Sequence, residues 1–86
     1  MTAANNVQNF AFNPADMTVA AGTTVTWTNN DSVAHTVTWD DQSVDSGLFG
    51  AGETFSFTFA EAGTYGYFCR PHGSPGAGMH GSVTVT

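Results

Sequence analysis

The chain has no lysine, and Arg70 is the only basic residue among its 86. Seven acidic side chains stand against that single positive charge, so the formal net charge is −6 at pH 7. Proteins that bind nucleic acids or anionic membranes use clusters of lysine and arginine. The composition therefore argues against nucleic acid and an anionic bilayer as partners. The negative charge is compatible with binding to a basic partner, with binding of a cation, or with solubility alone.

Cysteine is also scarce, because Cys69 is the only one. No internal disulfide can form, and no disulfide partner is expected. The uncharged runs are interrupted by threonine, serine, asparagine and glycine, so no transmembrane segment is predicted. The first residues are neither basic nor apolar, so no signal peptide is predicted within this sequence. We interpret the sequence as a mature or excised domain.

Isoleucine is absent and Leu48 is the only leucine, whereas there are 13 threonines and eight valines. Such a composition is typical of strands, and no segment carries an apolar stripe of helical period. Alternation of apolar and polar residues predicts about seven strands, near residues 10–12, 17–19, 24–28, 33–39, 54–59, 65–69 and 83–85. Residues 40–52 lack alternation and are predicted to form a surface loop. The prediction is one all-β domain, residues 1–86, folded as a small antiparallel sandwich.

His35 lies on the face of its predicted strand that Val33, Val37 and Trp39 share and that should point inward. One interpretation is a buried neutral histidine that hydrogen-bonds to the backbone. The other is a metal ligand fixed on a rigid strand. His35 alone does not decide between them.

The segment from Cys69 to His80 carries the other candidate ligands. Cys69 ends an inward-facing run, His72 follows after a proline, and Met79 comes just before the last predicted strand. A thiolate, two imidazoles and a thioether form the ligand set of a blue-copper site, with a weak axial methionine. Zinc is the competing metal, but it seldom uses a thioether.

These residues and their surroundings resemble the cupredoxins, closest to the plastocyanin, amicyanin and halocyanin group. The resemblance covers nearly the whole chain, through NFAFNPADMTVAAGTTVTWTNNDSVAHTV, DSGLFGAGETFSFTFAEAGTYGYFC and RPHGSPGAGMHGSVTV. It implies a Greek-key β-sandwich that holds one copper ion of type 1. The ligands that it implies are His35, Cys69, His72 and Met79.

The resemblance implies single-electron transfer between Cu(I) and Cu(II) rather than enzymatic catalysis. Redox partner proteins are expected to dock transiently near His72, whose loop is rich in small residues, and the chain is expected to be a monomer. An extracytoplasmic compartment is expected, namely the periplasm, a cell surface or a lumen. This expectation is compatible with a membrane anchor in the full-length protein.

The sequence departs from the family in two places. Six residues separate His72 from Met79, more than the family usually has, so a looser axial side of the copper is expected. The residue after the first histidine ligand is often asparagine in the family and is Thr36 here. Its hydroxyl could still reach the Cys69 segment by a hydrogen bond.

The looser axial side motivates an alternative function, a copper centre that reacts with a small molecule such as nitric oxide or a reduced oxygen species. A copper carrier or buffer is a third hypothesis, although buried ligands on rigid elements argue against rapid release of the metal. Three other features have two interpretations each. His80 is an exposed histidine or an alternative ligand, Tyr67 is a packing residue or an electron relay, and the acids Asp40, Asp41 and Asp45 form a solvated loop or a docking patch.

Overall fold

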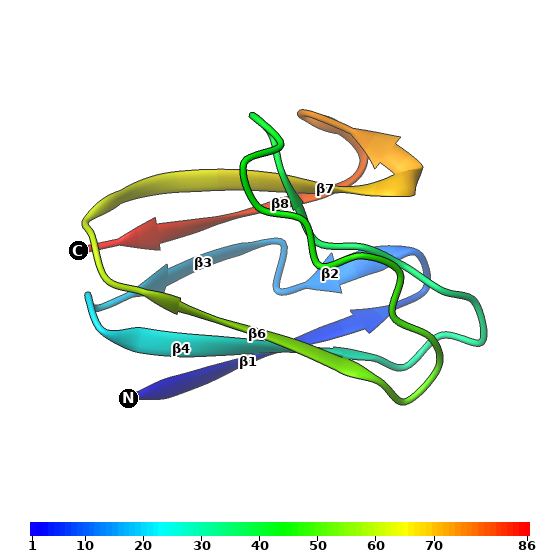
Figure 1. The fold of residues 1–86 in the computed structure, drawn as a ribbon, viewed down its shortest axis with the longest axis horizontal. Helices are drawn as coiled ribbons and strands as arrows, with labels where there is room; N and C mark the ends of the chain where they lie inside the picture. Colours follow the sequence, from blue (N-terminus) through cyan, green and yellow to red (C-terminus); the bar gives the residue numbers. More distant parts are fainter.

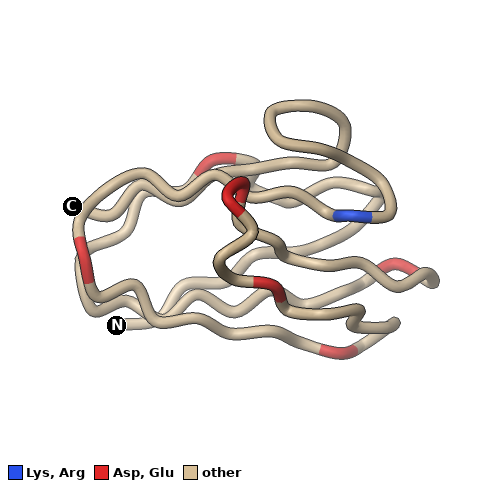
Figure 2. Tube along the Cα trace, turned by 45° about the horizontal axis from the view of Figure 1, so that its top comes forward, with Lys and Arg blue, Asp and Glu red and all other residues tan.

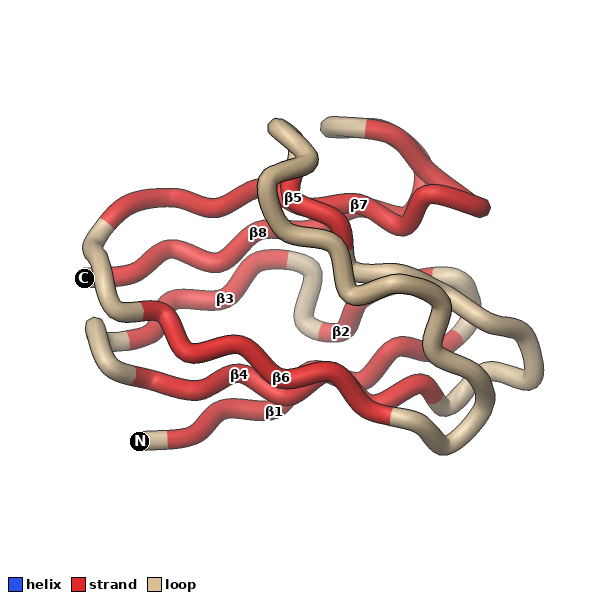
Figure 3. The backbone as a smooth tube through the Cα atoms, viewed as in Figure 1, coloured by secondary structure: helices blue, strands red, loops and turns tan.

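Two four-stranded sheets lie face to face in the computed structural model, which describes all residues, 1–86 (Figure 1). The first sheet has the order β2-β1-β4-β6, formed by β1 Thr2–Gln8, β2 Ala11–Asn13, β4 Thr23–Asn29 and β6 Thr54–Phe59. The second has the order β3-β8-β7-β5, formed by β3 Asp16–Val19, β5 Thr38–Trp39, β7 Gly63–Ser74 and β8 Ala77–Val85. Figure 3 shows that no helix is present. The all-β Greek-key sandwich is therefore confirmed, with eight strands instead of about seven.

Two strand pairs are parallel, which corrects the expectation of an antiparallel sandwich. β1 pairs with β4 in parallel, and β3 pairs with β8 in parallel, whereas the other neighbours are antiparallel. The chain passes from one sheet to the other between β2 and β3, so strands distant in sequence become neighbours in each sheet. Hairpin connections alone would have made every pair antiparallel.

The core between the sheets follows from alternation within the strands. In β4, Val25 and Trp27 are completely buried, whereas Thr24 and Thr26, which alternate with them, point away and hydrogen-bond across to β6. Phe59 and Tyr67 pack against Trp27 with ring centroids 6.4 and 5.5 Å away. Burial of these large rings removes apolar surface from water and so stabilises the packing of the two sheets.

The predicted strand over residues 33–39 is mostly wrong. Only Thr38–Trp39 form a strand, and His35 makes a single bridge to Phe49. Both alternating sets from His35 to Trp39 are buried, whereas Val33 is 39% exposed. The predicted surface loop over 40–52 also contains a core residue, since Phe49 is only 5% exposed. The loop folds back on the 33–39 segment, and this long-range packing buries residues that local alternation would place outside.

The N-terminal strand β1 was not predicted, because its one strongly apolar residue, Val7, gives no alternating pattern. Asn5 occupies another inward position and is buried because its amide donates to the Pro14 carbonyl at 2.9 Å. The predicted strand 10–12 lies one residue further along the chain, as β2 Ala11–Asn13. Phe12 is buried in β2, but Phe10 lies in the turn between β1 and β2 and is 53% exposed.

Three connections gather at the end of the sandwich opposite the two termini: the β1–β2 turn, the segment from β4 to β5, and the β7–β8 hairpin (Figure 1). Figure 2 shows that the acidic residues are spread along the chain and that Arg70, the one basic residue, lies on the stretch that leads into the hairpin. This end of the molecule therefore brings together segments from both sheets and from distant parts of the sequence.

We expect Phe12→Ala to lower the free energy of unfolding by about 3–5 kcal/mol, since truncating a buried phenylalanine removes apolar burial and leaves a cavity. Phe10→Ala is the matched control, and its cost should stay within about 1 kcal/mol because the ring is half exposed. Urea denaturation of both variants measures the difference. Equal costs would contradict the placement of the two rings.

Candidate metal centre

Three side chains that carry metal-binding atoms converge at the end opposite the termini. The Nδ1 atoms of His35 and His72 are 3.2 Å apart, and each lies 3.6 Å from Cys69 Sγ. His35 and Cys69 are completely buried, whereas His72 is exposed. The structure thus brings together three of the four residues that the sequence singled out as ligands.

The spacing of these atoms suits a single metal ion. Bonds of about 2.0–2.3 Å from one trigonal ion place its nitrogen and sulfur ligands about 3.5–3.8 Å apart. The observed separations of 3.2–3.6 Å are close to that range. The donor set of one thiol and two imidazoles therefore fits a soft or borderline transition metal, and copper is included in that class.

His35 is held in place by Phe49, from the loop between β5 and β6. The backbone N–H of His35 donates to the Phe49 carbonyl at 3.2 Å, and the N–H of Phe49 donates back at 2.9 Å. Asn29 is completely buried at the end of β4. Its amide donates to the carbonyls of Val33 and Phe49 at 2.8 and 2.9 Å and so holds the two segments that flank His35. A ligand outside any long strand thus gains a rigid backbone from hydrogen bonds.

Cys69 lies in β7, and residue 36 ties it to the 33–39 segment. The backbone N–H of Thr36 donates to Cys69 Sγ at 3.5 Å. The Thr36 hydroxyl accepts the backbone N–H of Arg70 at 2.9 Å and lies 3.0 Å from the Thr38 hydroxyl. The predicted hydrogen bond from Thr36 to the Cys69 segment is therefore confirmed, although threonine stands where relatives often carry asparagine.

The six residues between His72 and Met79 do not form the irregular loop that the sequence suggested. Gly73 pairs with Gly78 and Ser74 pairs with Ala77, so β7 and β8 continue into a narrow hairpin after an irregularity between Phe68 and Gly73. A side chain at Gly73 would collide with the backbone of Met79, so only glycine permits this close approach. The extra length is taken up by the hairpin.

Met79 lies inside β8 and not before the last strand as predicted. It is 3% exposed and packs in the same buried cluster as Cys69. A buried methionine on a strand is held by its neighbours, which argues against the loose axial side expected from the loop length. Its role as a ligand stays a prediction.

Two residues near the site had no assigned role in the sequence. Asp31 Oδ2 accepts a hydrogen bond from His35 Nε2 at 2.8 Å. The backbone N–H of Phe10, followed by the N–H of Asn9 and by His35, holds the pKa of the Asp31 carboxyl below its ordinary value, although desolvation opposes the shift. The Phe10 ring meets the His72 ring edge-on at 4.8 Å. The only sequence signal was the spacing of four residues between Asp31 and His35.

Other candidate residues lie outside the cluster. His80 is exposed in β8, in agreement with the first of its two interpretations. Tyr67 is completely buried against Trp27, and burial raises the pKa of its phenol to about 12. Tyr67 is therefore a neutral core residue at physiological pH. Arg70 pairs with Asp45 through Nε and Oδ2 at 2.8 Å, which links the stretch after Cys69 to the β5–β6 loop.

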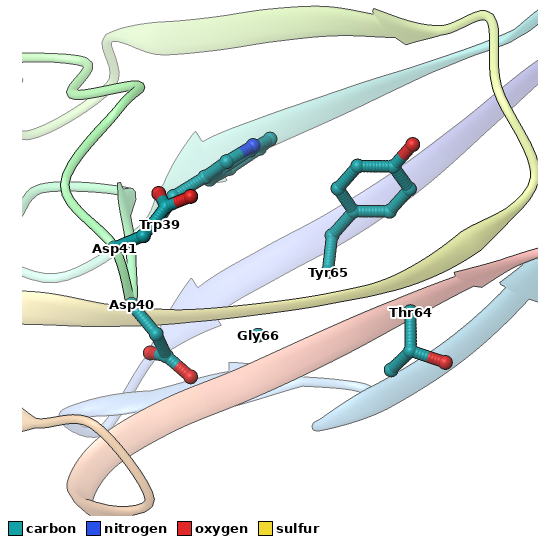
Figure 4. A pocket seen from close by; sticks show the side chains of 6 residues that line it. All are labelled: Trp39, Asp40, Asp41, Thr64, Tyr65 and Gly66. Carbon is teal, nitrogen blue, oxygen red and sulfur yellow. The ribbon is translucent and has the colours of Figure 1, made fainter.

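A hollow of about 260 Å³ lies elsewhere on the surface, lined by Trp39, Asp40, Asp41, Thr64, Tyr65 and Gly66 (Figure 4). None of its lining residues belongs to the ligand cluster. Asp41 accepts hydrogen bonds from the Ser43 hydroxyl and backbone N–H at 2.7 and 2.9 Å, which lower the pKa of its carboxyl. These contacts are local to one turn, as expected for a solvated acidic loop.

Comparison with known proteins agrees with this site. The family described as copper binding proteins, plastocyanin/azurin family, matches residues 1–86. Plastocyanin of Scenedesmus fuscus is 45% identical over 85 residues, covering 86% of this chain and 85% of the relative. The chloroplastic plastocyanin of Oryza sativa subsp. indica is also 45% identical over 85 residues, covering 86% of this chain and 54% of the relative. A mutant of amicyanin solved with Cu(I) superposes with a TM-score of 0.88 at 28% identity, covering 99% of this chain and 82% of the amicyanin.

We expect Thr36→Val to cost about 1 kcal/mol more stability than Thr38→Val. Both substitutions keep the shape of the side chain and break the hydrogen bond between the Thr36 and Thr38 hydroxyls. Only Thr36→Val also leaves the Arg70 N–H without its acceptor. Denaturant unfolding and hydrogen exchange of the Arg70 amide measure the difference. Equal stabilities, together with unchanged exchange at Arg70, would show that Thr36 does not hold the Cys69 segment.

Proposed function

Because the chain belongs to the plastocyanin/azurin family of copper-binding proteins, we propose that it is a small blue-copper electron carrier and not an enzyme. The observation that carries the proposal is the convergence of Cys69 Sγ with the Nδ1 atoms of His35 and His72 within 3.6 Å of one another. One bound copper ion would supply the one-electron couple between Cu(I) and Cu(II). The residues of the chain determine how that ion would be bound and how a redox partner would approach it.

Cys69 would bind as a thiolate, and His35 and His72 would bind through Nδ1. The N–H of Thr36, directed at Cys69 Sγ, would share the negative charge of the thiolate. Met79 is our proposal for the weak axial ligand. Its burial in the cluster that contains Cys69 supports this role.

Rigid ligands suit electron transfer, because a site that moves little between two oxidation states has little to reorganise. The backbone of His35 is bridged to Phe49, and Thr36 joins the His35 segment to the Cys69 strand. Glycine contacts between the arms of the β7–β8 hairpin hold the segment between His72 and Met79. Each proposed ligand is therefore positioned by hydrogen bonds and backbone contacts between elements of the fold.

Redox partners would dock transiently at the end of the sandwich where His72 is exposed. Phe10 and Val33 are apolar residues on the converging connections and are 53% and 39% exposed. Leu48, on the β5–β6 loop, is 66% exposed and lines a hollow together with Thr36, Arg70 and Pro71. A small apolar contact of this kind suits a short-lived complex between proteins, with the −6 net charge adding long-range attraction to a basic partner. We propose that the carrier works as a monomer.

An extracytoplasmic location is part of the proposal. The rice relative is a chloroplast protein, and copper-thiolate chemistry suits a compartment outside the cytoplasm. The structure contains no helix that is both long and apolar enough to span a bilayer. A lipid or peptide anchor in a longer precursor stays a proposal.

The alternative function, reaction of the copper with nitric oxide or a reduced oxygen species, is not favoured. It was motivated by a loose axial side, but Met79 is buried in β8 and the extra residues form a paired hairpin. The relatives are plastocyanins. A copper carrier is not favoured either, since His35 and Cys69 are completely buried.

We expect the Cu(II) form to show intense visible absorption that disappears on reduction and that Cys69→Ser abolishes, because the absorption arises from a thiolate bonded to copper. His80→Asn is the control: it removes an exposed histidine of the same strand region and should leave the band unchanged. Absorption spectra of the copper-loaded proteins provide the measurement. A visible band that persists in Cys69→Ser would refute the proposed ligand set.

For docking, we expect Leu48→Glu to slow electron self-exchange about tenfold or more, because each encounter would then bring like charges together at the contact. Ala60→Glu adds the same charge just after β6, near the termini, and should slow the exchange far less. NMR line broadening in mixtures of the Cu(I) and Cu(II) forms measures the rate. Equal slowing by the two variants would place the contact elsewhere.

A further inference from the structure

Asp31 joins two segments of the chain at the candidate copper centre. Its Oδ1 accepts the backbone N–H of Asn9 at 2.7 Å, and its Oδ2 accepts the N–H of Phe10 at 3.0 Å and His35 Nε2 at 2.8 Å. The side chain is 13% exposed and the His35 side chain is completely buried. One carboxylate therefore accepts from a buried candidate ligand and from a turn more than twenty residues away in sequence.

The contact with His35 determines which ring nitrogen carries the proton. An ionised carboxylate only accepts hydrogen bonds, so His35 Nε2 must donate and must hold the proton. The lone pair of the neutral ring is then on Nδ1, which faces Cys69 Sγ and His72 Nδ1. The same contact fixes the rotation of the ring, as outer partners of metal-binding histidines commonly do.

The contact with the turn holds a conformation that side-chain-bearing residues seldom adopt. Asn9 and Phe10 have φ of 56° and 55° and form the two-residue turn between Gln8 and Ala11. A bulky aromatic residue in this left-handed region is a rare and strained arrangement. Two consecutive N–H groups donating to one carboxylate offset that strain, because charge-assisted hydrogen bonds are the stronger kind.

The turn in this conformation places the Phe10 ring against both imidazoles. Its centroid is 4.8 Å from that of His72 and 5.6 Å from that of His35, with the rings edge-on. Phe10 is 53% exposed, so the ring lies between solvent and the two histidines instead of being part of the core. The conformation of the turn thus decides how far the copper centre is covered.

We propose that Asp31 is a positioning residue of the copper centre, which fixes His35 for binding through Nδ1 and, with the same carboxylate, holds the turn that lays Phe10 over both imidazoles. The proposal rests on the electron-carrier function proposed above. It adds a residue that binds no metal but orients His35 and, through the turn that carries Phe10, covers both histidines.

The charge has its own consequence for the redox potential. A fixed anion hydrogen-bonded to the ring of one ligand favours the ion of higher charge, Cu(II), over Cu(I). Asp31 is the only acidic residue with a hydrogen bond to a candidate ligand; Asp45 pairs with Arg70, and Asp41 bonds only to Ser43. The reduction potential should therefore depend on Asp31 more than on any other acidic residue.

The test uses Asp31→Asn in the full chain. Asparagine keeps the shape but has one oxygen for three donors that approach from two sides, so at least one side loses its acceptor whichever way the amide turns. In the metal-free protein we expect exchange with solvent to accelerate about tenfold or more at the donors that lose their acceptor, either the Asn9 amide or the Phe10 amide together with the His35 Nε2–H, as seen by NMR. In the copper-loaded protein the ratio of Cu(I) to Cu(II) affinity should rise about tenfold, which corresponds to about 59 mV in potential.

Asp41→Asn is the matched control, since it removes the same charge from an exposed turn. It should leave exchange at all three sites unchanged and shift the potential by a small fraction of the Asp31 effect. Asp31→Glu keeps the charge but adds a methylene that displaces the carboxylate, so it should keep most of the low potential while accelerating exchange at the turn.

The outcomes separate this proposal from the function on which it rests. If the copper-loaded protein without substitutions shows no visible band, the copper site is refuted. The exchange measurements on the metal-free protein would still decide the role of Asp31. A normal band with equal potentials for Asp31→Asn and Asp41→Asn would overturn the electrostatic role. An Asp31→Glu protein that matches Asp31→Asn in potential would also overturn the electrostatic role. Unchanged exchange at His35, Asn9 and Phe10 in Asp31→Asn would overturn the positioning role.

Discussion

The candidate metal centre requires three atoms with lone pairs, one sulfur and two nitrogens, to lie within 3.6 Å of one another. Such a cluster does not assemble by itself, because polar atoms brought together out of water lose hydration. Surrounding structure must therefore fix each of them independently. Much of the architecture at the end opposite the termini serves this purpose, and it does so with backbone and side-chain hydrogen bonds more than with apolar contacts.

The two sheets contribute different supports to the cluster. From the first sheet, Asn29 at the end of β4 uses its amide to hold Val33 and Phe49, and Phe49 in turn pairs with the backbone of His35. From the second sheet, β7 carries Cys69, and Thr36 joins that strand to the His35 segment. The site therefore depends on the correct packing of one sheet on the other, and the aromatic core around Trp27 ensures that packing.

Sequence reasoning was sound where local pattern and chemistry agree. The alternation in β4 and β6 identified those strands, and the thiol, imidazole and thioether side chains identified the candidate ligands because few other sites need that set. It failed where tertiary contacts decide. β1 was missed because Asn5 is buried for a hydrogen bond and not for its hydrophobicity. The hairpin after His72 was missed because its glycines matter for the approach of two backbones, a property of spatial neighbours that residue identity alone does not show.

The two histidines of the cluster are chemically alike, yet the fold gives them separate tasks. His35 is completely buried, and its outer nitrogen is occupied by Asp31, so it contributes nothing to the surface. His72 is exposed, lies on the hairpin side, and is covered in part by a single aromatic ring. In the proposed electron carrier, an electron that enters or leaves through a ligand edge would pass by His72, whereas His35 would anchor the centre to the protein. Because Asp31 holds both the anchor and the turn that bears the covering ring, the orientation of the buried histidine and the access to the exposed one depend on the same carboxylate.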